Sequence, residues 1–225
     1  MKTTMTLLLA VLLSLGFAVT SFAAGTDGTI LGSSHDLSGK NIGSDEVCIF
    51  CHTPHNAVDS SGNGVPLWSM TDSPSSTFIP YTSTTFDGGT VTALAGPTLV
   101  CMSCHDGVVA MNNALMTNVD PLDDPAEAVM GSNSSALIGI DLSNDHPVGF
   151  DYALSLANDN GEGVGGATEI KPLTSPIGSV TIADVLWGTI MTCASCHDVH
   201  NPGAGGYFLL QTNFKSGLCL ACHAK

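Results

Sequence analysis

Four copies of the string Cys-x-x-Cys-His use every cysteine of this 225-residue chain. In c-type haem attachment, both thiols of such a string form thioether bonds to porphyrin vinyl groups, and the adjacent imidazole ligates the iron. The sequence therefore predicts four covalently bound haem c groups. The predicted attachment residues are Cys48, Cys51, Cys101, Cys104, Cys193, Cys196, Cys219 and Cys222.

Zinc sites and disulfides are the two other common uses of paired cysteines. Two Cys-x-x-Cys units can build a zinc site of four thiolates, but such a site does not need a histidine directly after every second cysteine. The chain has only eight histidines, and four of them occupy that position. The pattern therefore favours haem over both alternatives.

The histidine count predicts how each iron is ligated. A six-coordinate haem iron takes two axial ligands, so four haems with two imidazoles each would use all eight histidines. Methionine is the competing distal ligand, but Met102, Met111 and Met191 are expected to pack on the porphyrins instead. The predicted iron ligands are the motif histidines His52, His105, His197 and His223, and the remaining histidines His35, His55, His146 and His200.

Spacing adds information on the four histidines outside the motifs. His55 and His200 each follow a motif histidine by three residues, so neither can reach the distal face of its own haem, and each must ligate a different haem close by. His146 precedes a proline, which favours extended backbone. His35 lies on a Gly/Ser-rich segment and has the most freedom to reach elsewhere. A first guess places His200 on the haem of Cys219 and His55 on a haem near the first motif.

The beginning of the chain resembles a secretory signal peptide. Residues 1–23 contain a short apolar run that ends in small residues, with Ser21 and Ala23 at the two positions before the expected cleavage site. A membrane anchor is the weaker alternative because the run is short for a span. The expected mature chain, 24–225, is exported, has no membrane span and forms a single tetrahaem domain.

Charge limits the partners. The chain has 20 acidic residues, five lysines and no arginine, for a formal net charge of −15. Nucleic-acid binding is therefore excluded. Acidic pairs such as Asp123-Asp124 are expected to be solvated faces rather than calcium sites. Contacts between copies of the chain would have to be apolar, hydrogen-bonded or through metal ligands.

Composition predicts the fold class. With 6% aromatic residues and 25 glycines the chain has little core of its own, so we expect it to wrap around a chain of four haems. The expected multihaem cytochrome c fold is mostly irregular, with short helices and a possible small β-hairpin. The expected elements are helices over 97–113 and 182–197, a hairpin within 77–95, and exposed loops at 120–125 and 160–166.

Two segments of the chain share a longer string. Residues 48–56 and 193–201 both read Cys-x-x-Cys-His-x-x-His-Asn. A duplicated two-haem unit, with the first two motifs in one copy and the last two in the other, would explain the match. Convergence on one ligand geometry is the alternative.

The motifs, taken in order, resemble the extracellular multihaem cytochromes of metal-reducing bacteria, and most closely the tetrahaem, filament-forming OmcE type. The resemblance covers nearly the whole mature chain. It implies a homopolymer in which haems run end to end, each with two histidine ligands, one of them supplied by a neighbouring subunit. His35 or another histidine outside the motifs would be the ligand that a neighbouring subunit supplies. The strings that carry the resemblance are Ser34-His35-Asp36, Cys48-x-x-Cys51-His52-Thr-Pro-His55-Asn56, Pro66-Leu-Trp68, Cys101-x-Ser-Cys104-His105-Asp-Gly107, Asn144-Asp-His146-Pro-Val-Gly149 and Cys193-x-Ser-Cys196-His197-Asp-Val-His200-Asn201.

The function expected from these residues is electron transfer without catalysis. Iron with both axial positions filled has no open site for a substrate, which disfavours haem reductases. The expected partners are further copies of the chain, other redox cytochromes and extracellular electron acceptors. A soluble monomeric periplasmic tetrahaem shuttle and a haem reductase with one labile ligand are the alternatives.

Overall fold

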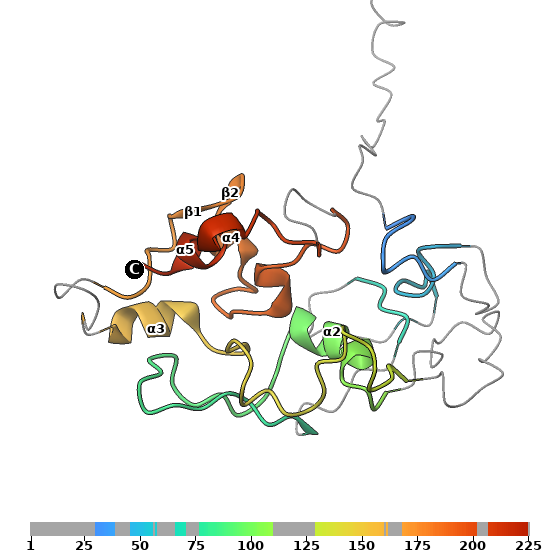
Figure 1. The fold of residues 1–225 in the computed structure, drawn as a ribbon, viewed down its shortest axis with the longest axis horizontal. Helices are drawn as coiled ribbons and strands as arrows, with labels where there is room; N and C mark the ends of the chain where they lie inside the picture. Colours follow the sequence, from blue (N-terminus) through green and yellow to red (C-terminus); the bar gives the residue numbers. More distant parts are fainter. Residues whose placement is uncertain are drawn as a thin grey trace, which may run out of the picture.

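The computed structural model describes residues 30–38, 46–55, 57, 66–70, 77–109, 129–159, 161, 168–201 and 207–224. Most of these residues lie outside helices and strands (Figure 1). The described elements are α2 (Pro97–His105), α3 (Tyr152–Asn158), β1 (Pro176–Ile177), β2 (Val180–Thr181), α4 (Ile182–Val185), the 3₁₀ turns η2 (Cys193–Ser195) and η3 (Phe214–Ser216), and α5 (Cys219–Cys222). The expectation of a mostly irregular chain with short helices and one small hairpin is confirmed.

The hairpin lies elsewhere than expected. β1 and β2 pair antiparallel, with Pro176 opposite Thr181 and Ile177 opposite Val180. The segment 77–95 forms no strand; a single bridge joins Ile79 to Asp141, far along the chain. The predicted hairpin at 77–95 is therefore wrong, because its extended residues pair with a distant segment instead of with each other.

Both predicted helices are longer than the observed ones. α2 begins at Pro97, whose fixed φ suits a first helical turn, and ends at His105, where the next residue, Asp106, accepts the N–H groups of Val108 and Val109. Over 182–197 the structure has only α4 and η2, because Trp187 and Ile190 form an extended bridge between them. The predicted signal peptide (1–23), the loop 120–125, Met111, and the loop 160–166 apart from residue 161 lie outside the described residues.

Gly96 illustrates how tightly the irregular parts are packed. Its φ is +59°, and a Cβ at this position would lie 2.6 Å from the Trp187 ring. A side chain here would both strain the backbone and collide with the indole. The start of α2 is thereby fixed against the segment that leads to the third motif, and η2 packs on α2.

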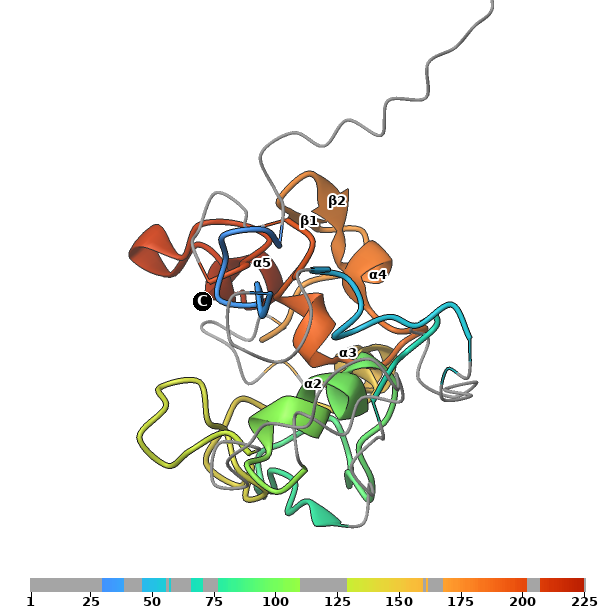
Figure 2. The same ribbon diagram turned by 90° about the vertical axis from the view of Figure 1, so that its right-hand side faces the viewer.

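The apolar core is divided into small clusters. The largest lies in the carboxyl-terminal part, where α4, α5 and the hairpin come together (Figures 1 and 2). Its buried members are Val91, Phe150, Tyr152, Ile177, Ile182, Leu186, Met191 and Ala221. Another cluster contains only one buried residue, Phe50, within the first motif. Among the described residues no helix is long and apolar enough to cross a membrane.

Candidate functional site

Each Cys-x-x-Cys-His string folds into a single helical turn. In the first, third and fourth motifs the histidine N–H donates to the carbonyl of the first cysteine, at 2.9, 3.1 and 2.9 Å. The second motif lies within the last turns of α2. One turn of helix places residues three and four apart on one face, so both thiols and the imidazole of each motif share a side.

The imidazoles of three motif histidines are oriented by backbone carbonyls. The Nδ1 of His52 lies 2.9 Å from the Pro66 carbonyl, that of His105 lies 2.7 Å from the Ala136 carbonyl, and that of His197 lies 2.9 Å from the Tyr207 carbonyl. A carbonyl only accepts hydrogen bonds, so Nδ1–H must donate in each case. The Nε2 lone pair is left for a metal, as in metal-binding histidines generally.

The first and third motifs are held by the same backbone arrangement. In the first, Thr53 N–H donates to the Leu67 carbonyl, Ser69 N–H donates to the Cys51 carbonyl, and His52 bridges Trp68. The third repeats each contact: Asp198 to Phe208, Leu210 to Cys196, and His197 opposite Leu209. We call the segments 66–69 and 207–210 the clamp segments.

The fourth motif shares all three of these contacts. Lys171 N–H donates to the Cys222 carbonyl, Ala224 N–H donates to the Glu169 carbonyl, and Ile170 bridges His223. Sequence reasoning missed all these partners except for the Pro66-Leu-Trp68 string. Since they act through backbone carbonyls and N–H groups, their side chains carry no common signal.

Three histidines from outside the motifs each lie against a motif histidine. Ring centroids are 6.0 Å apart for His35 and His105, 6.1 Å for His52 and His200, and 6.3 Å for His146 and His223. These six side chains come from widely separated parts of the chain. His200 lies against His52, whereas the first guess had placed it on the haem of Cys219.

The spacing of the pairs fits two ligands of one iron. A bond from a metal to an imidazole nitrogen is about 2 Å long, and the ring centre lies about 1 Å beyond the nitrogen, so two rings on opposite sides of one ion stand about 6 Å apart. The angles between ring planes are 89°, 22° and 74°. Such a difference is compatible with axial ligation, which would fix the distance between the rings and leave each ring free to rotate.

The two remaining histidines are not brought together. Among the described residues, neither His55 nor His197 faces another imidazole in the way that the three pairs do. His55 is exposed, although its backbone is held by the Thr53 hydroxyl, which bonds its carbonyl at 2.6 Å. One chain therefore places a second imidazole beside the motif histidine of the first, second and fourth motifs. At the third motif it supplies only the motif histidine.

His35 has the most enclosed ring of the pairs. It stacks on Phe208, with centroids 4.7 Å apart. Its Nδ1 is buried and has no hydrogen-bond partner. Burial lowers the pKa of His35, and the nearby His105 and His197 lower it further. The ring is therefore held neutral, which is the form that binds a metal.

The cysteines of consecutive motifs are neighbours. Cys51 acts electrostatically on Cys104, Cys101 and Cys193 share a hydrogen bond, and Cys222 acts on Cys196. The motifs thus follow one another in space in their order along the sequence: first, second, third, fourth. All eight thiols are free.

Three of the thiols have the electrostatics of buried, neutral groups. Burial raises the pKa of Cys51 to about 11, that of Cys104 to about 12 and that of Cys196 to about 11, and in each case a neighbouring cysteine adds to the effect. Cys193 is different, because the hydrogen bond from Cys101 lowers its pKa.

Met102 and Met191, which are expected to pack on the porphyrins, are both buried. Met70, which the sequence reasoning did not single out, lies with its sulfur 3.5 Å from the Cys104 sulfur. Trp68 belongs to the same apolar cluster as Met70, and Cys51 and Cys104 pack against that cluster. Its indole N–H is buried and has no hydrogen-bond partner.

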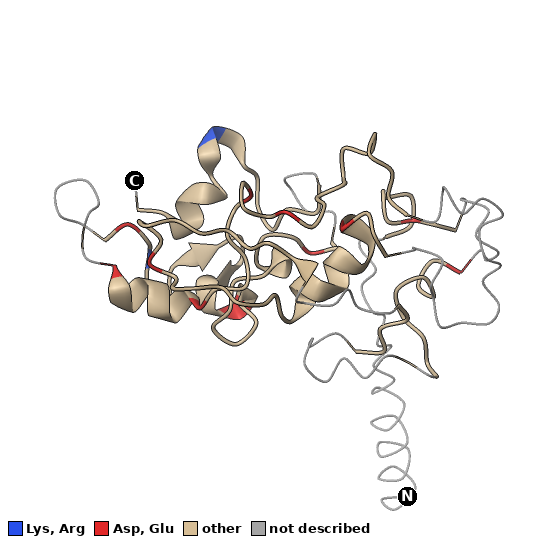
Figure 3. Ribbon diagram, turned by 90° about the horizontal axis from the view of Figure 1, so that it is seen from below, with Lys and Arg blue, Asp and Glu red and all other residues tan. Residues whose placement is uncertain are grey.

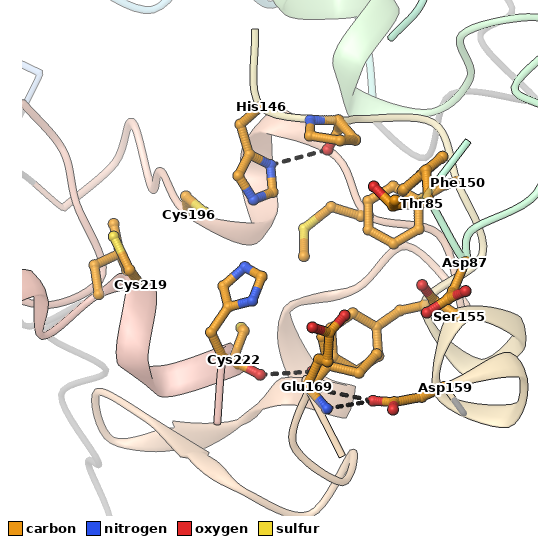
Figure 4. A pocket seen from close by; sticks show the side chains of 17 residues that line it. Thr85, Asp87, His146, Phe150, Ser155, Asp159, Glu169, Cys196, Cys219 and Cys222 are labelled. Carbon is orange, nitrogen blue, oxygen red and sulfur yellow. Dashed lines mark hydrogen bonds between the residues drawn. The ribbon is translucent and has the colours of Figure 1, made fainter. Parts of the chain in front are cut away.

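A cavity of about 210 Å³ lies at the fourth motif (Figure 4). The paired rings of His146 and His223 and the thiols of Cys219 and Cys222 are on its wall, and Cys196 of the third motif also reaches it. Thr85, Asp87, Ser155 and Asp159 line the side away from the thiols, and Glu169 lies near Cys222 (Figure 4). The cavity wall combines apolar side chains with a few polar groups, as the walls of ligand sites commonly do.

Within the described part of the chain, no group of three or more His, Cys, Asp and Glu side chains is arranged to hold a metal ion. A structural zinc site takes four protein ligands, whereas a haem iron takes four ligands from the porphyrin and needs only two from the protein. Paired imidazoles suit the second case. No family model matches the chain, and no curated protein matches it.

Proposed function

We propose that this chain is an electron-transfer protein that carries four c-type haems with two histidine ligands each and is the subunit of an extracellular filament. The three imidazole pairs, each of which joins a motif histidine to a distant histidine at 6.0 to 6.3 Å, carry the proposal. Haem iron supplies a one-electron carrier that cycles between two oxidation states. The residues of the chain then attach the haems, ligate the irons, set the spacing between the haems and leave no axial position open for a substrate.

Attachment and ligation are divided among separate parts of the chain. His35 completes the second motif, His200 the first and His146 the fourth. Because each second ligand comes from another region, the fold is complete only when the distant segments have met. The carbonyls of Pro66, Ala136 and Tyr207 keep the motif imidazoles in the orientation that ligation needs.

Spacing is supported by the contacts between cysteines of consecutive motifs. Thioether bonds at Cys101 and Cys193, which share a hydrogen bond, would bring the edges of two porphyrins together. The same holds for the first and second motifs, and for the third and fourth. A continuous row of closely spaced carriers is the arrangement that transfer over distance needs.

The third motif supports assembly of subunits through a shared iron ligand. His197 has its Nδ1 hydrogen bond but faces no second imidazole among the described residues, and His55 is exposed on the same kind of turn as His200. We assign His55 as the ligand that one subunit donates to the third motif of the next, in place of His35, which pairs within its own chain. The strong net charge of −15 makes a metal-ligand contact a suitable link between like-charged subunits.

The alternative functions make different use of the third motif. An open axial position at His197 would support a reductase, and an unexpected ligand from the same chain would support a monomeric periplasmic shuttle. Assembly outside the cell also depends on export through the expected leader at residues 1–23. Electron acceptors of the filament would be other cytochromes or extracellular oxidants.

The test uses the full chain matured with haem. We expect a pyridine haemochrome assay to give one haem per motif, electron paramagnetic resonance of the assembled protein to give only low-spin iron, and electron micrographs to contain filaments. Particles alone, with all iron low-spin, would favour the shuttle. High-spin iron that turns over nitrite or hydroxylamine in the assembled protein would favour the reductase and overturn the proposal.

A further inference from the structure

Lys171 is the described positive charge closest to any attachment motif. Its backbone N–H donates to the Cys222 carbonyl at 2.8 Å, and its ammonium donates to the Leu220 carbonyl at 2.5 Å. The side chain is half-buried, and its charge acts on the Cys222 thiol. Lys171 therefore joins the segment that clamps the fourth motif to the motif itself.

A second observation makes this charge unusual. The chain has 20 acidic residues and five lysines, and acidic segments are spread along the described chain (Figure 3). Lys215, the other described lysine, is exposed and lies 5.5 Å from the centre of the Phe214 ring. The described residues thus place one partly buried cation at a haem motif and a second one on the surface.

The surroundings of the fourth motif otherwise favour the oxidised state of an iron. Asp87, Asp159 and Glu169 line the cavity, with Asp87 and Asp159 on the side away from the thiols (Figure 4). The Asp159 carboxylate accepts from the N–H groups of Gly161, Glu169 and Ile170, which offsets part of its charge. Lys171 lies beside the motif itself, where its charge acts on the Cys222 thiol.

We propose that Lys171 sets the reduction potential of the haem at the fourth motif, by placing a half-buried positive charge beside the attachment helix α5. The inference rests on the proposed function. A nearby cation stabilises the electron-rich, reduced form of a haem. The haem next to Lys171 is therefore easier to reduce than its carboxylate-lined cavity alone would make it.

The experiment is a spectroelectrochemical titration of the matured full chain and three variants. Lys171→Gln keeps a hydrogen-bond donor for the Leu220 carbonyl but removes the charge, Lys171→Arg keeps the charge, and Lys215→Gln removes the exposed charge. We expect Lys171→Gln to move about a quarter of the absorbance change, one haem of the four, to a more negative potential. Lys171→Arg and Lys215→Gln should superimpose on the parent protein.

Two results would overturn the proposal. One is a Lys171→Gln titration that superimposes on that of Lys215→Gln. The other is an equal negative shift in Lys171→Arg, which would mean that packing and not charge sets the potential. If Lys171→Gln does not accumulate, Lys171→Met replaces it under the same criteria. Haem content and low-spin signals are measured on every variant, so failure of the proposed function, seen as missing haem, is distinct from failure of this inference.

Discussion

The first and third motifs have the same local structure, but the histidines that follow them have different surroundings. Each is one helical turn held by a clamp segment through the same backbone bonds, and each is followed three residues later by a histidine. His200 of the third motif lies against His52 of the first. His55 of the first motif is exposed and does not lie against His197. The local structure of the two motifs therefore directs the following histidine away from its own motif, and the tertiary structure decides which side chain that histidine contacts.

The largest expected effect comes from removing the two trailing histidines separately. His200→Ala deletes the imidazole that faces His52, so the isolated matured chain should convert about one of four haems from low spin to high spin. His55→Ala should leave the spectrum of the isolated chain unchanged and should abolish filaments. Electron paramagnetic resonance, carbon monoxide binding and electron microscopy measure these outcomes.

Equal spectral changes in the two variants of the isolated chain would contradict the difference between His200 and His55, because His55 would then serve a haem of its own chain. Filaments formed by His55→Ala would remove its role between subunits. His55→Met is the matched control, since a thioether can also ligate iron and should restore assembly in part.

The second prediction compares the same position inside the two motifs. Phe50 is 5% exposed and packs on Leu37, two residues from His35, whereas Ser195 is buried and accepts the Thr192 N–H at 3.0 Å. Phe50→Ala should lower the free energy of unfolding by about 3–5 kcal/mol, and Ser195→Ala by about 1 kcal/mol. Denaturant titration of the matured proteins measures both.

Phe50→Ala should also loosen the amino-terminal segment that carries His35, so part of the second-motif haem should become high-spin near the unfolding midpoint. Similar losses of stability in both variants would mean that the small cluster around Phe50 does not hold this segment in place.

The third prediction concerns the clamp segments, where a left-handed residue occurs in each. Leu67 has φ +58° and Phe208 has φ +59°. Leu67 is 51% exposed, so Leu67→Gly should relieve backbone strain with little loss of packing and stabilise the protein by about 1 kcal/mol. Phe208→Gly loses its stacking on His35 and should not be stabilising. Thermal unfolding of the two variants measures the difference; a gain in both would show that the stacking contributes nothing.

The smallest expected effect is a pH dependence specific to the part that carries the third motif. Asp151 caps α3 and accepts from the Thr189 hydroxyl at 2.8 Å, and these hydrogen bonds lower the pKa of its carboxyl below the usual 3.8. The folded state therefore binds this proton less readily than the unfolded chain. The stability from Asp151 is present above pH 3.8 and is lost as the pH falls through the folded pKa.

Asp151→Asn should flatten the acid limb of the stability curve slightly, since an amide can accept one of the two bonds but does not titrate. Unfolding followed between pH 2 and 5 by the near-ultraviolet signal measures it. A parallel acid limb in parent and variant would contradict the assignment, and Asp198→Asn is the control on the clamp side of the third motif.

The amino-acid pattern predicted the attachment residues and the sparse secondary structure, because both depend on residue types that can be read directly. It placed helices too long and the hairpin wrongly. Ile79 pairs with Asp141 instead of with a neighbour, and no local pattern encodes such a partner. The clamp segment 207–210 was missed because Tyr207 acts through its carbonyl.

The sequence by itself determined how many Cys-x-x-Cys-His strings there are and how many further histidines could pair with them, and it predicts that His200 does not serve its own motif. Spacing along a helical turn decides these points, and spacing is visible in the letters. Only the tertiary structure decided the pairs: His35 with His105, His200 with His52, and His146 with His223. These contacts join segments far apart in the chain, where chain connectivity imposes no distance and only packing of the whole molecule does.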